Sequence, residues 1–324
     1  MAALKKRTSR RQPSGFRAAV LLPVVLVGIF LVGSLVYTSY FKKGADRISS
    51  VLTDQSQVSS PRAPAFPPVS STRIPLPARP HEYEEAPPVV SEKKAPAPPA
   101  LPGTAARLAI IIDDMGSSMA EARSLAAIKL PLTFSLIPGL RSDREVCDFS
   151  IGQGIELMIH VPMQPKEWPS RRLEQNGLLV SMSAEEIEHR MEGFIKKFPE
   201  AVGVNNHMGS EFSEQEGKMA AVVQTLKKHN LFFIDSVTSP RSCGFTVAQS
   251  GGVRTARRNV FLDNTQEPAY ILGQLNQAVA YARAHGSAIA ICHPHPVTIA
   301  TLTTALPKLT GRGIRLVPVS SLVK

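Results

Sequence analysis

Two adjacent carboxylates, Asp113 and Asp114, follow a run of three branched apolar residues at 110–112. An apolar run bounded by polar residues is typical of a buried strand, so the two acids are expected at its carboxyl end, where α/β folds gather their chemistry. Neighbouring carboxylates in a half-buried place repel each other and therefore need a cation or a shared proton. The stretch by itself is also compatible with an Asp-rich turn that caps a helix.

Polar residues recur at the ends of other predicted strands. His160 belongs to the third, Asn205 and His207 end the fourth, Asp235 ends the fifth and His293 ends the seventh. Taken singly, each histidine is most simply a buried residue with a satisfied hydrogen bond. Because strand ends converge on one face of a barrel, however, two acids and three histidines would meet there. That set matches the ligands of a zinc or similar transition-metal hydrolase.

The elements that position these residues alternate between strands and helices, which indicates an α/β fold of parallel βαβ units. Seven or eight units in about 220 residues favour a closed or nearly closed (β/α) barrel. Capping boxes at 183–186 and 213–216 predict two helix starts, and Gly286 is expected to end a helix over 267–285. The predicted strands are 107–112, 132–137, 155–160, 201–205, 231–235, 259–262, 287–292 and 314–319.

Five short motifs occur in order over residues 105–324, at 112–116, 154–160, 205–209, 233–235 and 288–293. In content and order they resemble those of the polysaccharide deacetylases, the NodB-homology carbohydrate esterases, and in particular their divergent branch. The resemblance implies a NodB-like barrel and a metal-dependent hydrolase that removes acetyl groups from a polysaccharide. It covers the whole predicted folded domain.

The resemblance also implies roles for individual residues. The family's first motif provides a catalytic base and then a metal ligand, which fall on Asp113 and Asp114. The first metal histidine of the second motif falls on His160. The histidine of the last motif, which assists as general acid, falls on His293.

Two departures from the family pattern affect the expected metal site. The usual second metal histidine lies four residues after the first, and that position is Gln164 here. The arginine of the third motif is also missing, while His207 stands nearby. We therefore expect Asp114, His160 and His207 to bind a divalent metal, with zinc as the expected ion. If His207 points elsewhere, the alternative is a non-catalytic member that binds a glycan or an envelope protein through the same cleft.

The expected chemistry is hydrolysis of an N- or O-acetyl group on an envelope glycan. A metal with three protein ligands keeps a position for water and lowers its pKa. Asp113 would take the water proton and His293 would protonate the leaving amine. Asp113 could instead orient a metal-bound histidine. Further residues are expected to support the ligands or bind substrate: Glu156, Asn205, Asp235, Thr238, Arg241 and Asp263.

The N-terminal part of the chain has the composition of a membrane anchor. Residues 1–17 carry six Lys or Arg and no acid, and residues 18–37 contain no charge over 20 positions. Such a run spans about 30 Å as a helix, which is the thickness of a bilayer core. We therefore expect a basic cytoplasmic tail at 1–17 and an uncleaved anchor at 18–38. The rival interpretation is a cleaved signal peptide, although the apolar run is long and no Ala-x-Ala site follows it.

The remaining composition defines a linker and excludes one class of function. Residues 48–104 contain 13 of the 27 prolines, so 39–104 is expected to be a disordered linker before a folded domain at 105–324. The net charge of +11 would suggest nucleic acid, but residues 1–47 alone hold nine basic residues and one acid. The basicity is therefore mainly a topology signal. A role in binding nucleic acid has little support.

We predict that residues 105–324 lie outside the cytoplasm, facing the periplasm or cell exterior, and stay joined to the inner membrane, because the basic residues precede the apolar run. A reporter active only in the cytoplasm, fused after Lys324, should be inactive. An active fusion would contradict the topology. A mature protein that begins after residue 38 would contradict the anchor alone.

Overall fold

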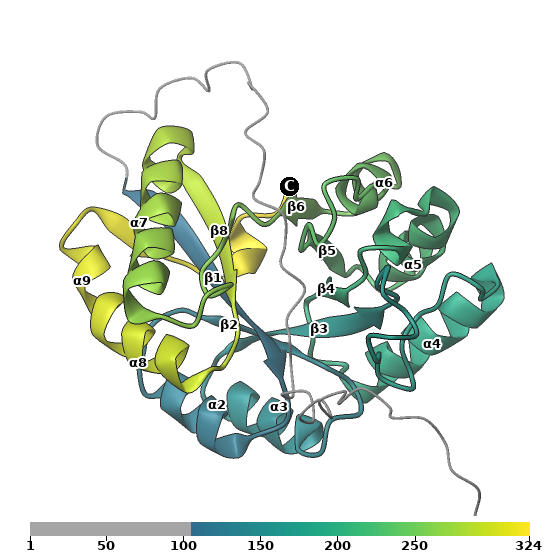
Figure 1. Ribbon diagram of the computed structural model, residues 1–324, viewed down its shortest axis with the longest axis horizontal. Coiled ribbons are helices and arrows are strands. Elements are labelled where there is room, and N and C mark those ends of the chain that lie inside the picture. The colour runs from purple at the N-terminus through teal and green to yellow at the C-terminus, as the bar shows by residue number, and fades with distance from the viewer. Residues whose placement is uncertain (1–104) are drawn as a thin grey trace, which may run out of the picture. The chain divides into compact units, whose positions relative to one another are not determined.

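The computed structural model describes residues 105–324 and builds them around one parallel sheet (Figure 1). The strand order is β6-β5-β4-β3-β2-β1-β8-β7, and β9 also pairs with β1. Every pairing is parallel, as strands joined by helical crossovers require. The strands are β1 (Ala106–Met115), β2 (Thr133–Leu136), β3 (Glu156–Met163), β4 (Gly203–Met208), β5 (Phe232–Asp235), β6 (Thr255–Arg257), β7 (Val260–Phe261), β8 (Ser287–Cys292) and β9 (Ile314–Leu316).

Helices follow the strands and cover the outside of the sheet (Figure 1). The helix α4 begins with the expected capping box, in which Ser183 and Glu186 satisfy each other's backbone N–H groups. The helix α7 ends at Gly286, whose left-handed backbone (φ 84°) a glycine adopts without a steric penalty. The helices are α2 (Met119–Ala126), α3 (Asp143–Gly152), α4 (Ala184–Lys197), η1 (Phe212–Glu214), α5 (Glu216–Lys228), α6 (Gly244–Ser250), α7 (Pro268–His285), α8 (Pro296–Ala305), α9 (Pro307–Thr310) and η2 (Val319–Ser321).

Two hydrophobic clusters separate the outside of the sheet from its inside. The even-numbered residues 108, 110 and 112 of β1 pack with the helices, whereas Ala109 and Ile111 pack in a smaller inner cluster. This split follows from the two-residue period of a strand. The inner cluster also takes Val317 and Val319 from the C-terminal segment. The inside of the curved sheet is therefore a packed core and not a pore.

The barrel is interrupted between β6 and β7. Among residues 105–324 no ladder of hydrogen bonds joins these two strands, which are the ends of the strand order. Instead the chain crosses directly from the β5 side of the gap to the β8 side. The N–H of Arg258 donates to Asp235 O on β5, and the N–H of the next residue, Asn259, donates to Ile289 O on β8. The expected barrel is therefore a partial one, and its parallel α/β architecture agrees with the sequence prediction.

Two local features differ from the sequence prediction. The strand β6 was not predicted. The helix α5 begins at Glu216 with Gln215 at the N-cap and no side-chain cap, because residues 212–214 form the short helix η1 where a capping box was expected to start.

The predicted anchor at 18–38 and linker at 39–104 lie outside the described residues. Among the helices of residues 105–324, none combines the length and the apolar character needed to cross a membrane.

The close approach of β4 and β5 gives a test of the packing. A Cβ atom at Gly203 would lie 2.3 Å from the Phe232 ring. We expect Gly203→Ala to lower the free energy of unfolding by about 1–3 kcal/mol, since overpacking forces side chains and backbone to shift. Gly193→Ala is the matched control, because Gly193 is in α4 with nothing within 4 Å of the new atom. It should raise stability by about 0.5–1 kcal/mol. Urea unfolding measures the free energy of unfolding of both variants. Equal values for Gly203→Ala and Gly193→Ala would contradict this packing.

Candidate metal centre

A polar layer lies above the inner apolar cluster, at the carboxyl end of the strands. On β1 the inward series 109, 111 continues to Asp113, and on β3 Met158 is followed two residues later by His160. On β4 the series reaches Asn205 and then His207. On β8 it runs through 289 and 291 to His293, just beyond the strand. The two-residue period of parallel strands therefore delivers these side chains to one level.

Asp114 reaches the same place through an irregularity in β1. Successive residues of a regular strand point to opposite faces, so Asp113 and Asp114 should diverge. The pairing of β1 with β2 shifts register between Ile112 and Met115, and Asp114 has a left-handed backbone (φ 55°). Aspartate tolerates this conformation better than most residues, and such strain is common at functional sites. Both carboxylates consequently lie within 3.5 Å of His160 Nε2.

Asn205 connects the acid and histidine sides of this layer. Its Nδ2 donates to both carboxylate oxygens of Asp113 at 2.9 and 3.0 Å and approaches Ser236 Oγ at 3.1 Å. Its Oδ1 accepts from Ser135 Oγ at 2.5 Å and lies 2.9 Å from His160 Nδ1. An ionised carboxylate only accepts hydrogen bonds, so the amide orientation is fixed and His160 Nδ1 must carry a proton. The Nε2 atom of His160 is then free to bind a metal, as the nitrogen opposite a hydrogen-bonded one usually does.

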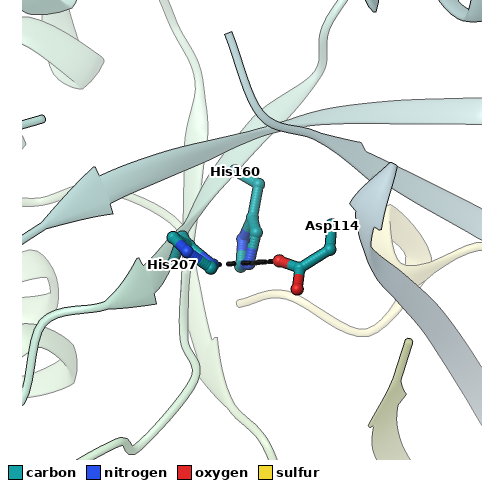
Figure 2. A group of neighbouring side chains, drawn as sticks. All are labelled: Asp114, His160 and His207. Atoms are coloured by element: carbon teal, nitrogen blue, oxygen red, sulfur yellow. Dashed lines mark ion pairs between the residues drawn. The ribbon is translucent and has the colours of Figure 1, made fainter. Parts of the chain in front are cut away.

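Asp114, His160 and His207 converge on one point (Figure 2). The Oδ1 atom of Asp114 lies 3.2 Å from His160 Nε2 and 2.9 Å from His207 Nδ1. Neither nitrogen is aligned for a hydrogen bond, so within residues 105–324 this buried oxygen accepts none. Ligands at about 2.0–2.2 Å around a tetrahedral zinc lie about 3.4 Å apart. Small side-chain rotations would therefore make room for an ion among the three.

The two neighbouring acids have opposite electrostatic environments. Burial raises the pKa of Asp113 above its usual value, although the nearby histidines act against it. Burial acts in the same direction on Asp114, but the charge of His207 and the contact with His160 outweigh it and hold the pKa of Asp114 well below its usual range. In return, Asp114 raises the pKa of His207 against the effect of burial. Asp114 is thus the better anion, whereas Asp113 more readily accepts a proton.

His293 is fixed on the opposite side of the layer by Asp263. One oxygen of Asp263 lies 3.0 Å from His293 Nδ1, and the other accepts the backbone N–H of His293 and the Thr298 hydroxyl. The imidazole stacks on Phe261, which in turn lies under the guanidinium of Arg258 at 3.9 Å. Burial lowers the pKa of His293, but the charge of Asp263 and its hydrogen bond raise it to about 9. His293 is therefore a positioned proton donor.

Asp263, His293 and His295 form a second group with metal-ligand atoms. Both oxygens of Asp263 already accept hydrogen bonds from His293 or Thr298. The carboxylate therefore acts on His293 as a hydrogen-bond acceptor, and Asp114, His160 and His207 form the better-suited metal group.

Three of the expected support residues lie at the end of β5 or in the segment after it, and the contacts that follow are with that segment, η1 and the end of β4. Asp235 accepts hydrogen bonds from Val237 N, Ser242 Oγ and Phe245 N, and so organises the turn after β5. Thr238 links Asn206 to the end of β4. Arg241 is an exposed partner of Glu214.

Glu156 is a correction to the expected site. It begins β3, four residues before His160, and therefore lies toward the amino end of the sheet. There it accepts hydrogen bonds from Thr133 Oγ1 and the backbone of Ser320. Its role is to join β2 to the C-terminal segment, and the structure does not bring it to the polar layer.

Several residues of the layer were not identified from the sequence. Ser135, Ser236, Arg258 and Phe261 are ordinary polar or apolar residues within their segments, with no motif that marks them. The inward strand positions 135 and 236 could have been found by extending the two-residue period of β2 and β5. Arg258 had no such signal, because it lies at the crossing between β6 and β7.

The fold and site together define an α/β partial barrel with a polar, potentially metal-binding layer at the carboxyl ends of its strands. The sequence pattern of the divergent polysaccharide deacetylases matches residues 110–323. The uncharacterized protein YibQ of Escherichia coli K12 is 38% identical over 222 residues, which cover 68% of this chain and 69% of that protein. The chain therefore belongs to the divergent polysaccharide deacetylase family.

Two further proteins are similar to this chain. An uncharacterized protein of Haemophilus influenzae is 37% identical over 203 residues, covering 63% of this chain and 72% of the relative. The crystal structure of the uncharacterized protein ATU2773 of Agrobacterium tumefaciens C58 superposes with a TM-score of 0.64 at 24% identity, over 70% of this chain and 93% of that one. The last comparison shows the shared fold.

The pairing of His293 with Asp263 can be tested by titration. In protein treated with a chelator, His293 should titrate at about pH 9. Asp263→Asn removes the charge and should return the pKa toward the usual value of about 6.5. A raised histidine pKa adds stability that is complete below about pH 6.5 and is lost as the pH rises through about 9, so the variant should lose this part of the pH dependence. NMR titration of the His293 ring decides. Asp148→Asn, on an exposed helix face, is the control, and an unchanged His293 pKa in Asp263→Asn would contradict the assignment.

Proposed function

We propose that this protein is a metal-dependent deacetylase that hydrolyses acetyl groups on a cell-envelope polysaccharide. The observation that carries the proposal is the orphaned Oδ1 of Asp114, placed between two imidazole nitrogens at 2.9 and 3.2 Å. The carboxylate oxygen and the nitrogen lone pairs that face it repel one another unless a proton or a metal ion lies among them, and three converging ligand atoms suit a metal ion. Family membership supports the same conclusion.

One carboxylate and two histidines are a suitable ligand set for zinc, which we propose as the ion. Asp114, His160 and His207 would hold it, and the hydrogen bond between His160 and Asn205 fixes one ring in the ligating orientation. When bound, a divalent ion would polarise the acyl carbonyl and lower the pKa of a water molecule. The residues around it then have to move two protons.

Asp113 and His293 are placed to move those protons. Asp113 is 2% exposed, lies 3.5 Å from His160 Nε2, and has a raised pKa, which suits a general base better than a strongly acidic carboxylate would. Asn205 Nδ2 holds the carboxylate in place. His293 has a raised pKa and so retains at neutral pH a proton that it can give to the leaving amine or alcohol. The base and the acid come from β1 and from the turn after β8, neighbouring strands in the sheet.

The proposed setting is the bacterial envelope. The basic tail, the apolar run at 18–38 and the proline-rich segment at 39–104 support a domain tethered to the inner membrane and facing the periplasm or cell exterior. The membrane and the envelope glycan are then the proposed partners. An envelope protein is a further candidate partner.

Asp113 and Asp114 should respond differently to the same substitution, which tests the proposal. Asp114→Asn should lose most bound zinc and therefore activity, because it removes an anionic ligand. Asp113→Asn should keep its zinc and fold, while acetate release from acetylated peptidoglycan falls by about 10²- to 10⁴-fold, since the general base is lost. Zinc content by elemental analysis and acetate release on the full chain provide the two measurements.

Exposed Asp148→Asn is the control and should match the wild type in both measurements. Equal zinc loss in Asp113→Asn and Asp114→Asn would make Asp113 a ligand and not a base. A zinc-loaded wild-type protein that releases no acetate from any envelope glycan tested would contradict the hydrolase and leave a glycan-binding protein.

A further inference from the structure

Glu174 faces the second nitrogen of His207 and lies outside the group of candidate ligand atoms. Its Oε2 lies 3.8 Å from His207 Nε2, while His207 Nδ1 faces Asp114. The Oε2 atom is buried, and no residue between 105 and 324 donates a hydrogen bond to it. Leaving a carboxylate oxygen buried in this way costs free energy unless a donor or a cation is within reach. His207 Nε2 lies within ion-pair distance of this oxygen, and a small rotation of either side chain would bring it within hydrogen-bond reach.

The segment that carries Glu174 is held firmly against the site. Residues 164–183 connect β3 to α4, and Leu178 returns to pair with Met163 at the end of β3. The N–H of Leu178 donates to Pro162 O at 2.7 Å, and the N–H of Gly177 donates to Glu174 O at 2.8 Å. These bonds hold the backbone of the segment against the end of β3, and the Glu174 side chain, 28% exposed, reaches from there toward His207 on β4.

Two further contacts fix the same segment from outside. Asn176 Nδ2 donates to Pro138 O at 2.7 Å, which ties the segment to the loop after β2. Arg190 of α4 donates to the carbonyl oxygens of Gln175 and Gly177. A carboxylate on a segment with this many backbone attachments can orient a neighbouring ring at a small entropic cost.

We propose that Glu174 is a positioning residue. Its carboxylate accepts a hydrogen bond from the Nε2–H group of His207 and so keeps Nδ1 directed at the metal. This inference rests on the proposed metal site. Metal-binding histidines commonly give their other N–H to a carboxylate, which fixes the tautomer and raises the basicity of the ligand. Glu174 faces the nitrogen away from Asp114 and is outside the group of ligand atoms, so it acts through His207.

The same logic applies to both histidines of the centre, with different partners. His160 donates a hydrogen bond from Nδ1 to Asn205 Oδ1 and directs Nε2 at Asp114. His207 directs Nδ1 at Asp114, and Glu174 stands at its Nε2. A neutral amide supports one ring and a carboxylate supports the other, so the negative charge of Glu174 also compensates the charge of the ion.

The first measurement is zinc affinity of the full chain by competition with a chromophoric chelator. Glu174→Ala should weaken zinc binding by about 10- to 100-fold, the usual cost of removing such a support. Glu174→Gln keeps an acceptor and loses the charge, so its affinity should fall between those of Glu174→Ala and the wild type. Glu167→Ala is the matched control, since Glu167 is exposed on the same segment. It should bind zinc like the wild type.

Two readouts separate positioning from a merely structural role. In the zinc-loaded wild type, NMR should show a slowly exchanging proton on His207 Nε2, and this signal should be lost in Glu174→Ala. In a His207→Ala background, Glu174→Ala should cost less than about twofold more in affinity, because its partner is already gone. The same loss in both backgrounds would mean that Glu174 only stabilises the segment, and would overturn the proposal.

The remaining outcomes distinguish this proposal from the proposed function. Wild-type zinc affinity in Glu174→Ala, together with normal zinc binding by the wild type, would overturn the role of Glu174 and leave the metal site intact. A wild-type chain that binds no divalent ion would overturn both.

Discussion

The side-chain amide of Asn205 is fully buried and can satisfy its neighbours in only one orientation. The carboxylate of Asp113 demands the NH₂ group, so the oxygen has to face His160 and Ser135. That single choice fixes the tautomer of His160 and, through it, the direction of the nitrogen that faces Asp114. Truncating the amide would leave buried donors and acceptors on three strands without partners, each at a cost of about 1–3 kcal/mol. The geometry of the candidate metal centre therefore depends on a neutral residue that is not among its ligand atoms.

The barrel interior explains why the chemistry lies where it does. Inward positions near the amino end are filled by Ala109, Ile111 and their neighbours, closed below by Val317 and Val319 of the C-terminal segment. One strand period further on, the inward positions carry acids, amides and imidazoles. The apolar layer excludes water from below, which strengthens every electrostatic interaction in the polar layer above it. It also explains the raised pKa of Asp113, whose largest cause is burial.

The sequence predicted the parallel architecture and most strands because apolar runs and their two-residue period are local signals. It also predicted that His207 lies beside Asp114. It did not show how adjacent Asp113 and Asp114 reach one site. That depends on the left-handed backbone at Asp114 and the register shift against β2, which arise from pairing between segments. Glu174 was missed for the same reason, since its approach to His207 depends on how the segment after β3 folds back.

Gln164 links these observations. Gln164 stands where the resemblance led us to expect a metal histidine. Its side-chain oxygen accepts the N–H of Val180 at 3.0 Å, and its backbone N–H donates to Leu178 O. Gln164 thus ties down the segment that carries Glu174. The order of residues 164–183 is therefore a condition for the proposed contact between Glu174 and His207.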